Sequence, residues 1–109
     1  MDIGRLNKRI TFQQPFQDKQ KKNEYGEPVD EWEDIKTVWA EIAPVSGNQF
    51  FAAKQINSEI THNVYIRYRE GLKPNMRVLF KGRVFEILYI MNIKEENRLL
   101  QIYCKELVK

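Results

Sequence analysis

Apolar and polar side chains alternate along two segments in the first half of the chain, a period typical of half-buried β-strands. In residues 8–13, Ile10 and Phe12 point to one face, and Arg9 points to the other. Residues 36–45 continue the same pattern over a longer stretch. The expected inward face of this second segment consists of Val38, Ala40 and Ile42. We therefore predict two amphipathic strands that contribute to one core.

The stretch between these strands is polar and rich in turn-forming residues. Residues 14–28 contain two prolines, a glycine and a run of charged side chains, which predicts a long mobile loop. A further short strand is expected at residues 29–33, around Trp32. Pro44 cannot donate a backbone hydrogen bond, so it predicts a sheet edge or a bulge at the end of the longer strand.

A single helix is predicted at residues 46–56. Ser46 and Gln49 have the spacing of a capping box, and the alanines that follow favour helix. At helical periodicity, Phe50, Ala53 and Ile56 share one face. The segment is therefore expected to form a helix of two to three turns with an apolar side.

Strand patterns fill the second half of the chain, and tight turns separate them. The expected strands are residues 61–68, 76–80, 84–93 and 98–106. Leu100, Ile102 and Cys104 are expected to face the core together with Phe85, Ile87 and Tyr89. The count of about six or seven short strands against one helix predicts a mainly β fold. We expect a small antiparallel β-barrel in which residues 1–109 form a single domain.

Charge and composition exclude several classes of protein. The net charge of +3 is a mild excess and does not by itself indicate a nucleic-acid-binding protein. The single cysteine cannot form an internal disulfide. The N-terminal residues lack the apolar core of a signal peptide, and no apolar run reaches the length of a membrane helix. A soluble protein made in the cytoplasm, with no membrane partner, is the expectation.

Candidate catalytic residues are few. The only histidine, His62, and the only cysteine, Cys104, lie far apart in sequence, so they could act as a nucleophile and base only if the fold joined them. Their number and spacing do not suit a metal site, and the isolated glycines do not form a phosphate-binding loop. We expect no catalytic residues, no metal, no cofactor and no enzymatic activity.

One cluster of aromatic and basic residues suggests a binding function. Within the run YIRYR at 65–69, Tyr65, Arg67 and Arg69 share one side of a strand, and Arg77 is close in sequence. On a small barrel, aromatic and cationic side chains of this kind suit the binding of single-stranded nucleic acid. Tyrosine and arginine are also enriched at protein interfaces, so a docking surface is the competing interpretation.

The order of motifs resembles the phage head–tail joining family, also called head-completion or stopper proteins. The residues that carry the resemblance are GRLNKRITF at 4–12, EYGE at 24–27, Trp32, VWAEI at 38–42, Ser46-Gly47, Phe50, IRYR at 66–69, MRV at 76–78, Gly82-Arg83 and the last alternating strand. The resemblance runs from about residue 4 to residue 106. It implies a small β-barrel with long loops, which agrees with the strand pattern.

The resemblance also implies a function and a set of partners. Members of this family form a ring beneath the portal and adaptor proteins of the head, close the DNA channel after packaging, and offer a docking surface to the tail or tail-completion protein. The expected partners are these proteins, further copies of the chain and the packaged double-stranded DNA. The expected location is the head–tail interface of a virion assembled in the bacterial cytoplasm.

The family likeness also places two segments. The stretch at residues 46–59 is expected to face the channel, and the loop at 14–28 to face the adaptor or the tail. The candidate channel-facing residues are Gln49, Phe50, Phe51, Lys54 and Gln55. The candidate interface or DNA-facing residues are Tyr65, Arg67, Arg69 and Arg77.

Overall fold

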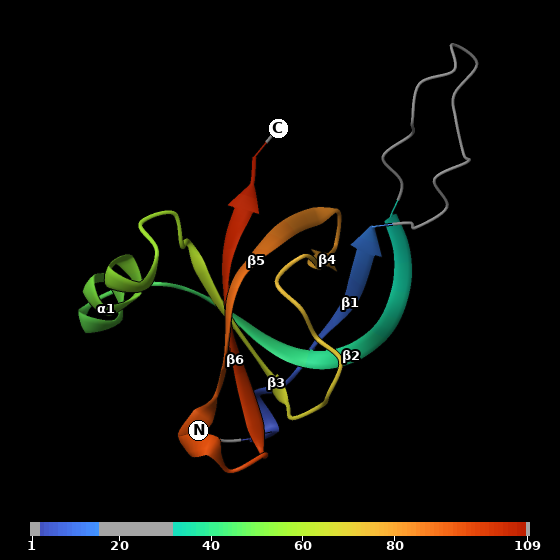
Figure 1. Ribbon diagram of the computed structural model, residues 1–109, viewed down its shortest axis with the longest axis horizontal. Helices are drawn as coiled ribbons and strands as arrows, with labels where there is room; N and C mark the ends of the chain where they lie inside the picture. The colour runs from blue at the N-terminus through green and yellow to red at the C-terminus, as the bar shows by residue number, and fades with distance from the viewer. Residues whose placement is uncertain (1–2, 16–31, 109) are drawn as a thin grey trace.

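A computed structural model describes residues 3–15 and 32–108, and the strands among them close into an antiparallel barrel (Figure 1). The strands are β1 (Lys8–Pro15), β2 (Trp32–Pro44), β3 (His62–Arg67), β4 (Arg77–Phe80), β5 (Arg83–Asn92) and β6 (Leu99–Leu107). Their order around the barrel is β1-β2-β3-β6-β5-β4, and β4 pairs with β1 to close it. The helix α1 (Asn48–Ile56) joins β2 to β3, and the short 3-10 turns η1 (Ile3–Arg5) and η2 (Ile93–Glu95) complete the described elements. The predicted mainly β barrel is confirmed.

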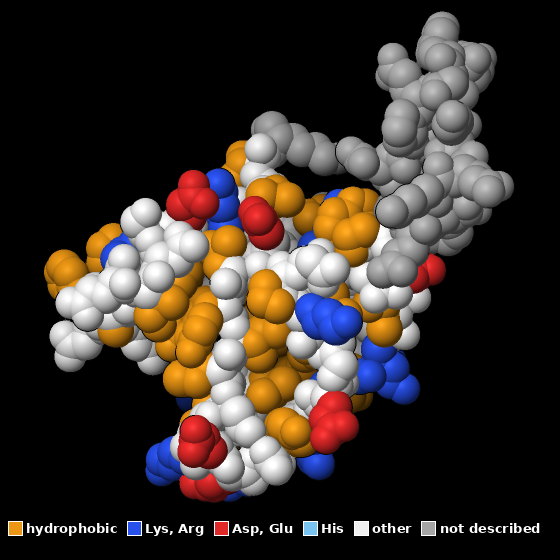
Figure 2. Space-filling view, in the orientation of Figure 1, with side chains coloured by type: hydrophobic (Ala, Val, Ile, Leu, Met, Phe, Trp, Pro, Cys, Tyr) orange, Lys and Arg blue, Asp and Glu red, His pale blue; other side chains and the backbone are white. Residues whose placement is uncertain are grey.

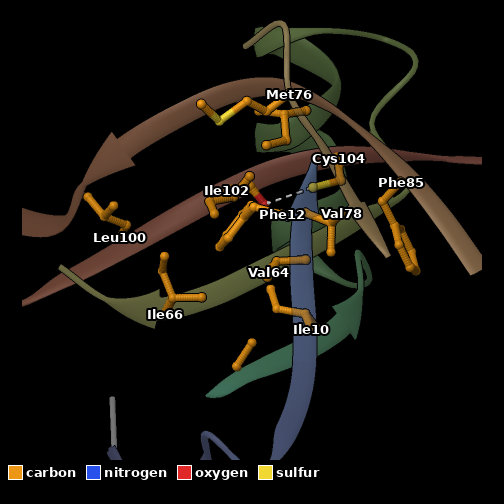
Figure 3. Packing of buried hydrophobic residues seen from close by; sticks show 12 residues of the cluster. Ile10, Phe12, Val64, Ile66, Met76, Val78, Phe85, Leu100, Ile102 and Cys104 are labelled. Atoms are coloured by element: carbon orange, nitrogen blue, oxygen red, sulfur yellow. Dashed lines mark hydrogen bonds between the residues drawn. The ribbon is translucent and has the colours of Figure 1, made fainter. Parts of the chain in front are cut away.

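The inward faces of all six strands form one apolar core (Figure 3). Phe12, Val64, Val78, Phe85 and Ile102 have no exposed surface. Removing this apolar area from water is the main stabilising contribution in a domain of this size. The predicted inward residues of the first two strands also face this core, so the alternation in the sequence identified the correct side of each strand.

Strand β2 is longer and more continuous than the sequence predicted. The strand expected at 29–33 and the one at 36–45 are, from Trp32 onward, a single strand. Pairing with β1 runs from Pro15 opposite Trp32 to Lys8 opposite Ala40, and a bulge interrupts it without ending the strand. The separation into two strands was therefore wrong. Residues 29–31 and most of the predicted loop at 14–28 lie outside the described residues, although its first two residues belong to β1.

A bulge in β5 changes which of its side chains face inward. The pairing with β6 shifts between Ile87 and Tyr89, so that Ile90, and not Tyr89, stands opposite Ile102. Tyr89 is consequently 47% exposed, whereas Ile90 packs against the core. The prediction that Tyr89 faces the core was wrong because the extra residue reverses the alternation beyond Ile87.

The helix forms where it was predicted but begins differently. Gly47 is the N-cap, with φ of 57°, and no side chain caps the helix, so the capping box of Ser46 and Gln49 is not formed. Ala53 is the only buried residue of α1. None of the described helices is both long enough and apolar enough to cross a lipid bilayer.

Candidate assembly surfaces

Helix α1 stands away from the barrel and exposes aromatic side chains (Figure 1). Phe50 is 42% exposed and Phe51 is 69% exposed, and their rings meet edge to face with centroids 5.6 Å apart. Figure 2 shows apolar side chains at this end of the molecule. Of the predicted apolar face, only Ala53 is covered, whereas Phe50 and Ile56, which is 45% exposed, are not. Large apolar side chains gathered in this way are typical of a surface that another molecule covers.

The contact that holds α1 to the barrel is narrow. Ala53 packs with Ile60 and Tyr103 in a small cluster separate from the main core. The ammonium of Lys54 donates hydrogen bonds of 2.8 Å to the carbonyl oxygens of Ser58 and Ile60. One small apolar residue and one lysine thus fix the helix, which leaves its outer side free for contacts with a partner.

The five predicted channel-facing residues lie together because they share this one helix. Gln49, Phe50, Phe51 and Gln55 are exposed, and Lys54 is partly buried. Lys54 is the only cation among them, and its ammonium already bonds to two carbonyl oxygens and lies 5.3 Å from the Phe50 ring centroid. The helix therefore presents amides and aromatic rings and no free cation.

The four predicted interface residues do not form one surface. Arg77 belongs to β4, which is not a neighbour of β3 in the barrel. Its Nε donates a 2.8 Å hydrogen bond to Gln13, and its guanidinium lies 4.1 Å from the Trp32 ring centroid. The Arg77 side chain thus contacts the C-terminal end of β1 and the N-terminal end of β2. Tyr65 is partly buried on β3, on the strand face opposite to Val64 and Ile66.

Arg67 and Arg69 line a groove that sequence reasoning did not predict. The groove has a volume of about 620 Å³, and its apolar part consists of Leu6, Val38, Trp39 and Tyr68. We call it the arginine groove, because Arg9, Arg67 and Arg69 also line it. Its residues come from three separate segments, and only the exposed position of Trp39, opposite to Val38 on β2, was visible as a signal in the sequence.

The fold does bring His62 and Cys104 onto neighbouring strands, where they are register partners. However, Cys104 is completely buried, its Sγ donates to the carbonyl oxygen of Ile102 at 3.7 Å, and burial raises its pKa. A nucleophilic cysteine requires an accessible thiolate. The geometry therefore does not support a Cys–His catalytic pair.

This burial makes Cys104 a slow target for thiol reagents. We expect labelling of the native protein at pH 8 to be at least a hundredfold slower than labelling in denaturant, since reaction requires opening of the barrel. Mass spectrometry over time measures both rates. Rapid labelling of the native protein would show that the thiol is accessible and would reopen the catalytic interpretation.

His62 belongs to a polar cluster at one end of the barrel. Its Nδ1 lies 2.9 Å from the Thr61 hydroxyl, and its Nε2 lies 3.4 Å from Arg83 and 3.9 Å from Glu106. Arg83 and Glu106 form a bidentate ion pair with distances of 2.8 and 2.9 Å. Burial lowers the pKa of His62 and Arg83 lowers it further, while Glu106 raises it. The neutral imidazole is therefore the form that the fold favours.

The lowered pKa of His62 predicts a pH dependence of stability. The folded protein binds a proton at His62 less readily than the unfolded chain, so its contribution to the free energy of unfolding is complete above pH 6.5 and declines as the pH falls below it. Denaturant titrations at pH 7.5 and 5.5 should show this decline, and the His62→Gln variant should lose it. The bond with Arg83 lowers the pKa of Glu106, whose own contribution is lost only at lower pH, below about 4.5. If the free energy of unfolding of the His62→Gln variant declined between pH 7.5 and 5.5 as much as that of the unaltered chain, the effect would belong to other groups.

Metal ligands do not gather in the described part of the chain. No group of three or more His, Cys, Asp or Glu side chains within residues 3–15 and 32–108 is arranged to hold an ion.

Comparisons with known proteins identify a family for this chain and similar solved structures. Residues 1–107 match the family described as phage head completion protein. The head completion protein gp16 of Bacillus phage SPP1 is 29% identical over 75 residues, which are 69% of this chain and 66% of that protein. The chain thus matches slightly less than two thirds of the length of this relative.

Two solved structures share the architecture over nearly the whole chain. A protein from Shigella flexneri 2a, whose solution structure is known, has 31% sequence identity and a TM-score of 0.69 over 97% of this chain and 96% of its own. A chain in the virion of a native gene transfer agent has 18% identity and a TM-score of 0.63 over 94% of this chain and 96% of its own, a likeness of fold alone. With the match of the family over residues 1–107, we conclude that this chain belongs to the phage head completion protein family.

Proposed function

We propose that this chain assembles as a ring beneath the portal and adaptor proteins, closes the DNA channel after packaging and provides the surface on which the tail docks. The family is one of structural proteins of the phage particle and not of enzymes. The observation that carries the proposal is helix α1, which exposes Phe50 and Phe51 and is fixed by a narrow contact. Exposed aromatic side chains on such a helix do not stabilise the isolated barrel, and they suit contacts with other proteins after assembly.

A ring of identical subunits requires two different surfaces on each subunit. A head-to-tail contact joins one patch to another, and a rotation that returns to its start closes the ring. The exposed aromatic side of α1 offers one such surface, and the barrel carries exposed apolar side chains elsewhere, at Tyr89 and Leu107. These features support self-association into a ring, in which α1 faces the channel.

The chemistry of α1 suits closure better than tight binding of DNA. A surface that neutralises many phosphates holds DNA through counterion release and would resist its passage. Lys54 is occupied by two carbonyl oxygens, and the exposed residues of the helix are uncharged. We therefore propose that Gln49, Phe50, Phe51 and Gln55 obstruct the channel by bulk and by contacts with neighbouring copies.

The alternative function, binding of single-stranded nucleic acid, has weaker support. A stacking platform needs an open aromatic face beside cations. Arg77 lies apart from Arg67 and Arg69, and the guanidinium of Arg9 lies over Trp39, 4.8 Å from its ring centroid.

We propose a virion component, assembled in the bacterial cytoplasm, whose partners are the adaptor and portal proteins, the tail or tail-completion protein and the packaged double-stranded DNA.

Electron microscopy of heads tests ring assembly and tail docking. Heads purified without this protein would be mixed with the purified chain and imaged at the portal vertex. We expect an added ring below the adaptor and, after addition of tails, joined particles. Heads incubated with buffer or with the heat-denatured chain provide the control. A portal vertex that is unchanged by the chain, or a single copy bound off the axis, would contradict the proposed ring.

A further inference from the structure

The arginine groove combines apolar side chains with three arginines, Arg9, Arg67 and Arg69. Leu6 is 9% exposed, and Trp39, at 53%, is the most exposed aromatic residue of the barrel strands. Within the described part of the chain, neither Arg67 nor Arg69 forms an ion pair with a carboxylate. The Nε of Arg69 is buried and has no hydrogen-bond partner.

A buried donor without an acceptor is unusual in a folded protein. Leaving such a group unpaired costs about 1–3 kcal/mol, so nearly all buried donors are satisfied. Two other arginines on the described barrel do have a carboxylate partner, Arg5 in Glu41 and Arg83 in Glu106. Unlike Arg5 and Arg83, Arg67 and Arg69 have no carboxylate partner among the described residues.

We propose that the arginine groove binds an acidic segment of another protein, which places an apolar side chain against Leu6, Trp39 and Tyr68 and carboxylates on Arg67 and Arg69. That the other protein is a neighbour in the phage neck rests on the proposed function, whereas the chemistry of binding does not. Arginine pairs with carboxylates in a bidentate manner, and Trp, Tyr and Arg are the residues that dominate protein interfaces.

A peptide suits this groove better than a nucleic acid. The volume of about 620 Å³ accommodates one or two side chains beside the charged pairs, and its floor is apolar. The guanidinium of Arg9 already occupies one face of Trp39, which reduces the surface available to a base. The groove is open to solvent at Arg67 and Trp39, so an extended segment can enter without rearrangement of the barrel.

Fluorescence of Trp39 reports binding directly. The Trp32→Phe background leaves Trp39 as the only tryptophan. The probes are a short peptide in which a leucine–phenylalanine pair is flanked by glutamates, the same peptide with glutamine in place of glutamate, and oligothymidylate. We expect the acidic peptide to bind, the glutamine peptide to bind roughly tenfold more weakly, and the affinity for the acidic peptide to fall with added salt.

Substitutions assign the binding to the groove. Arg67→Gln and Arg69→Gln should each weaken the acidic peptide by roughly tenfold, whereas Lys73→Gln, which removes the same charge from an exposed loop, should not. Thermal melts check the fold of each variant, and Arg67, which is exposed, provides the substitution least able to disturb it.

Three results would overturn the proposal. The first is equal binding of the two peptides, or no binding of either. The second is tighter binding of oligothymidylate, which would assign the groove to nucleic acid. The third is self-association of the chain, measured by sedimentation, that Arg67→Gln abolishes, which would assign the groove to a second copy. None of these readouts depends on closure of the channel, so a failure of this proposal is separate from a failure of the proposed function.

Discussion

Heads completed with the Phe50→Ser, Phe51→Ser double variant are expected to lose their packaged DNA to nuclease, whereas heads completed with the unaltered chain retain it. The aromatic rings of Phe50 and Phe51 supply most of the exposed side-chain volume of α1. Serine removes both this volume and the proposed apolar contact with neighbouring copies. The fraction of DNA that survives nuclease should fall at least tenfold, because the channel is either obstructed or open. Quantification of the resistant DNA measures the effect.

Two controls separate closure from folding and from general loss of apolar surface. Because Phe50 and Phe51 are exposed, the free energy of unfolding of the double variant should lie within about 0.5 kcal/mol of that of the unaltered chain. Ile35→Ser removes another exposed apolar side chain, at the far end of β2, and should leave DNA retention unchanged. Full retention of DNA by the stably folded double variant would show that α1 does not close the channel.

Phe12→Ala is expected to destabilise the barrel by about 3–5 kcal/mol, the largest effect on stability that we predict for a single substitution. Phe12 has no exposed surface and lies in the centre of the core, so its removal costs both the burial of the ring and the cavity left behind (Figure 3). A loss of this size is a large part of the total stability of a small domain. Denaturant titration followed by circular dichroism measures it.

Phe51→Ala provides the matched comparison, since it removes the same ring from an exposed position. We expect a change of less than about 0.5 kcal/mol for this variant. Similar losses for the two substitutions would mean that Phe51 is covered in solution or that Phe12 is not at the centre of the core.

The sequence predicted the fold well where local alternation decides it. Ile10 and Phe12 in β1, and Leu100, Ile102 and Cys104 in β6, face the core as predicted, because side chains alternate across an uninterrupted strand. Tyr89 was assigned to the wrong face because a bulge depends on pairing with another strand, which a single-strand pattern does not contain. The division of β2 was wrong for the same reason, since β1 holds the strand together.

For the candidate surfaces too, the sequence identified residues that share one segment but not residues that the barrel brings together. The five residues of α1 were found together because they belong to one short segment, but their exposure follows from the narrow contact at Ala53. Arg77 was grouped with Arg67 from closeness in sequence, whereas the order of the strands around the barrel separates β3 from β4. The arginine groove required the folding together of three distant segments and had no local pattern.

Nuclease protection of completed heads tests the central claim, closure of the DNA channel, most directly. Packaged heads that lack this protein would be mixed with the purified, unaltered chain and treated with nuclease, beside heads that receive buffer. We predict that the chain protects the packaged DNA and that buffer does not. Equal digestion in both samples, with the chain shown to be bound to the heads, would contradict closure of the channel by this protein.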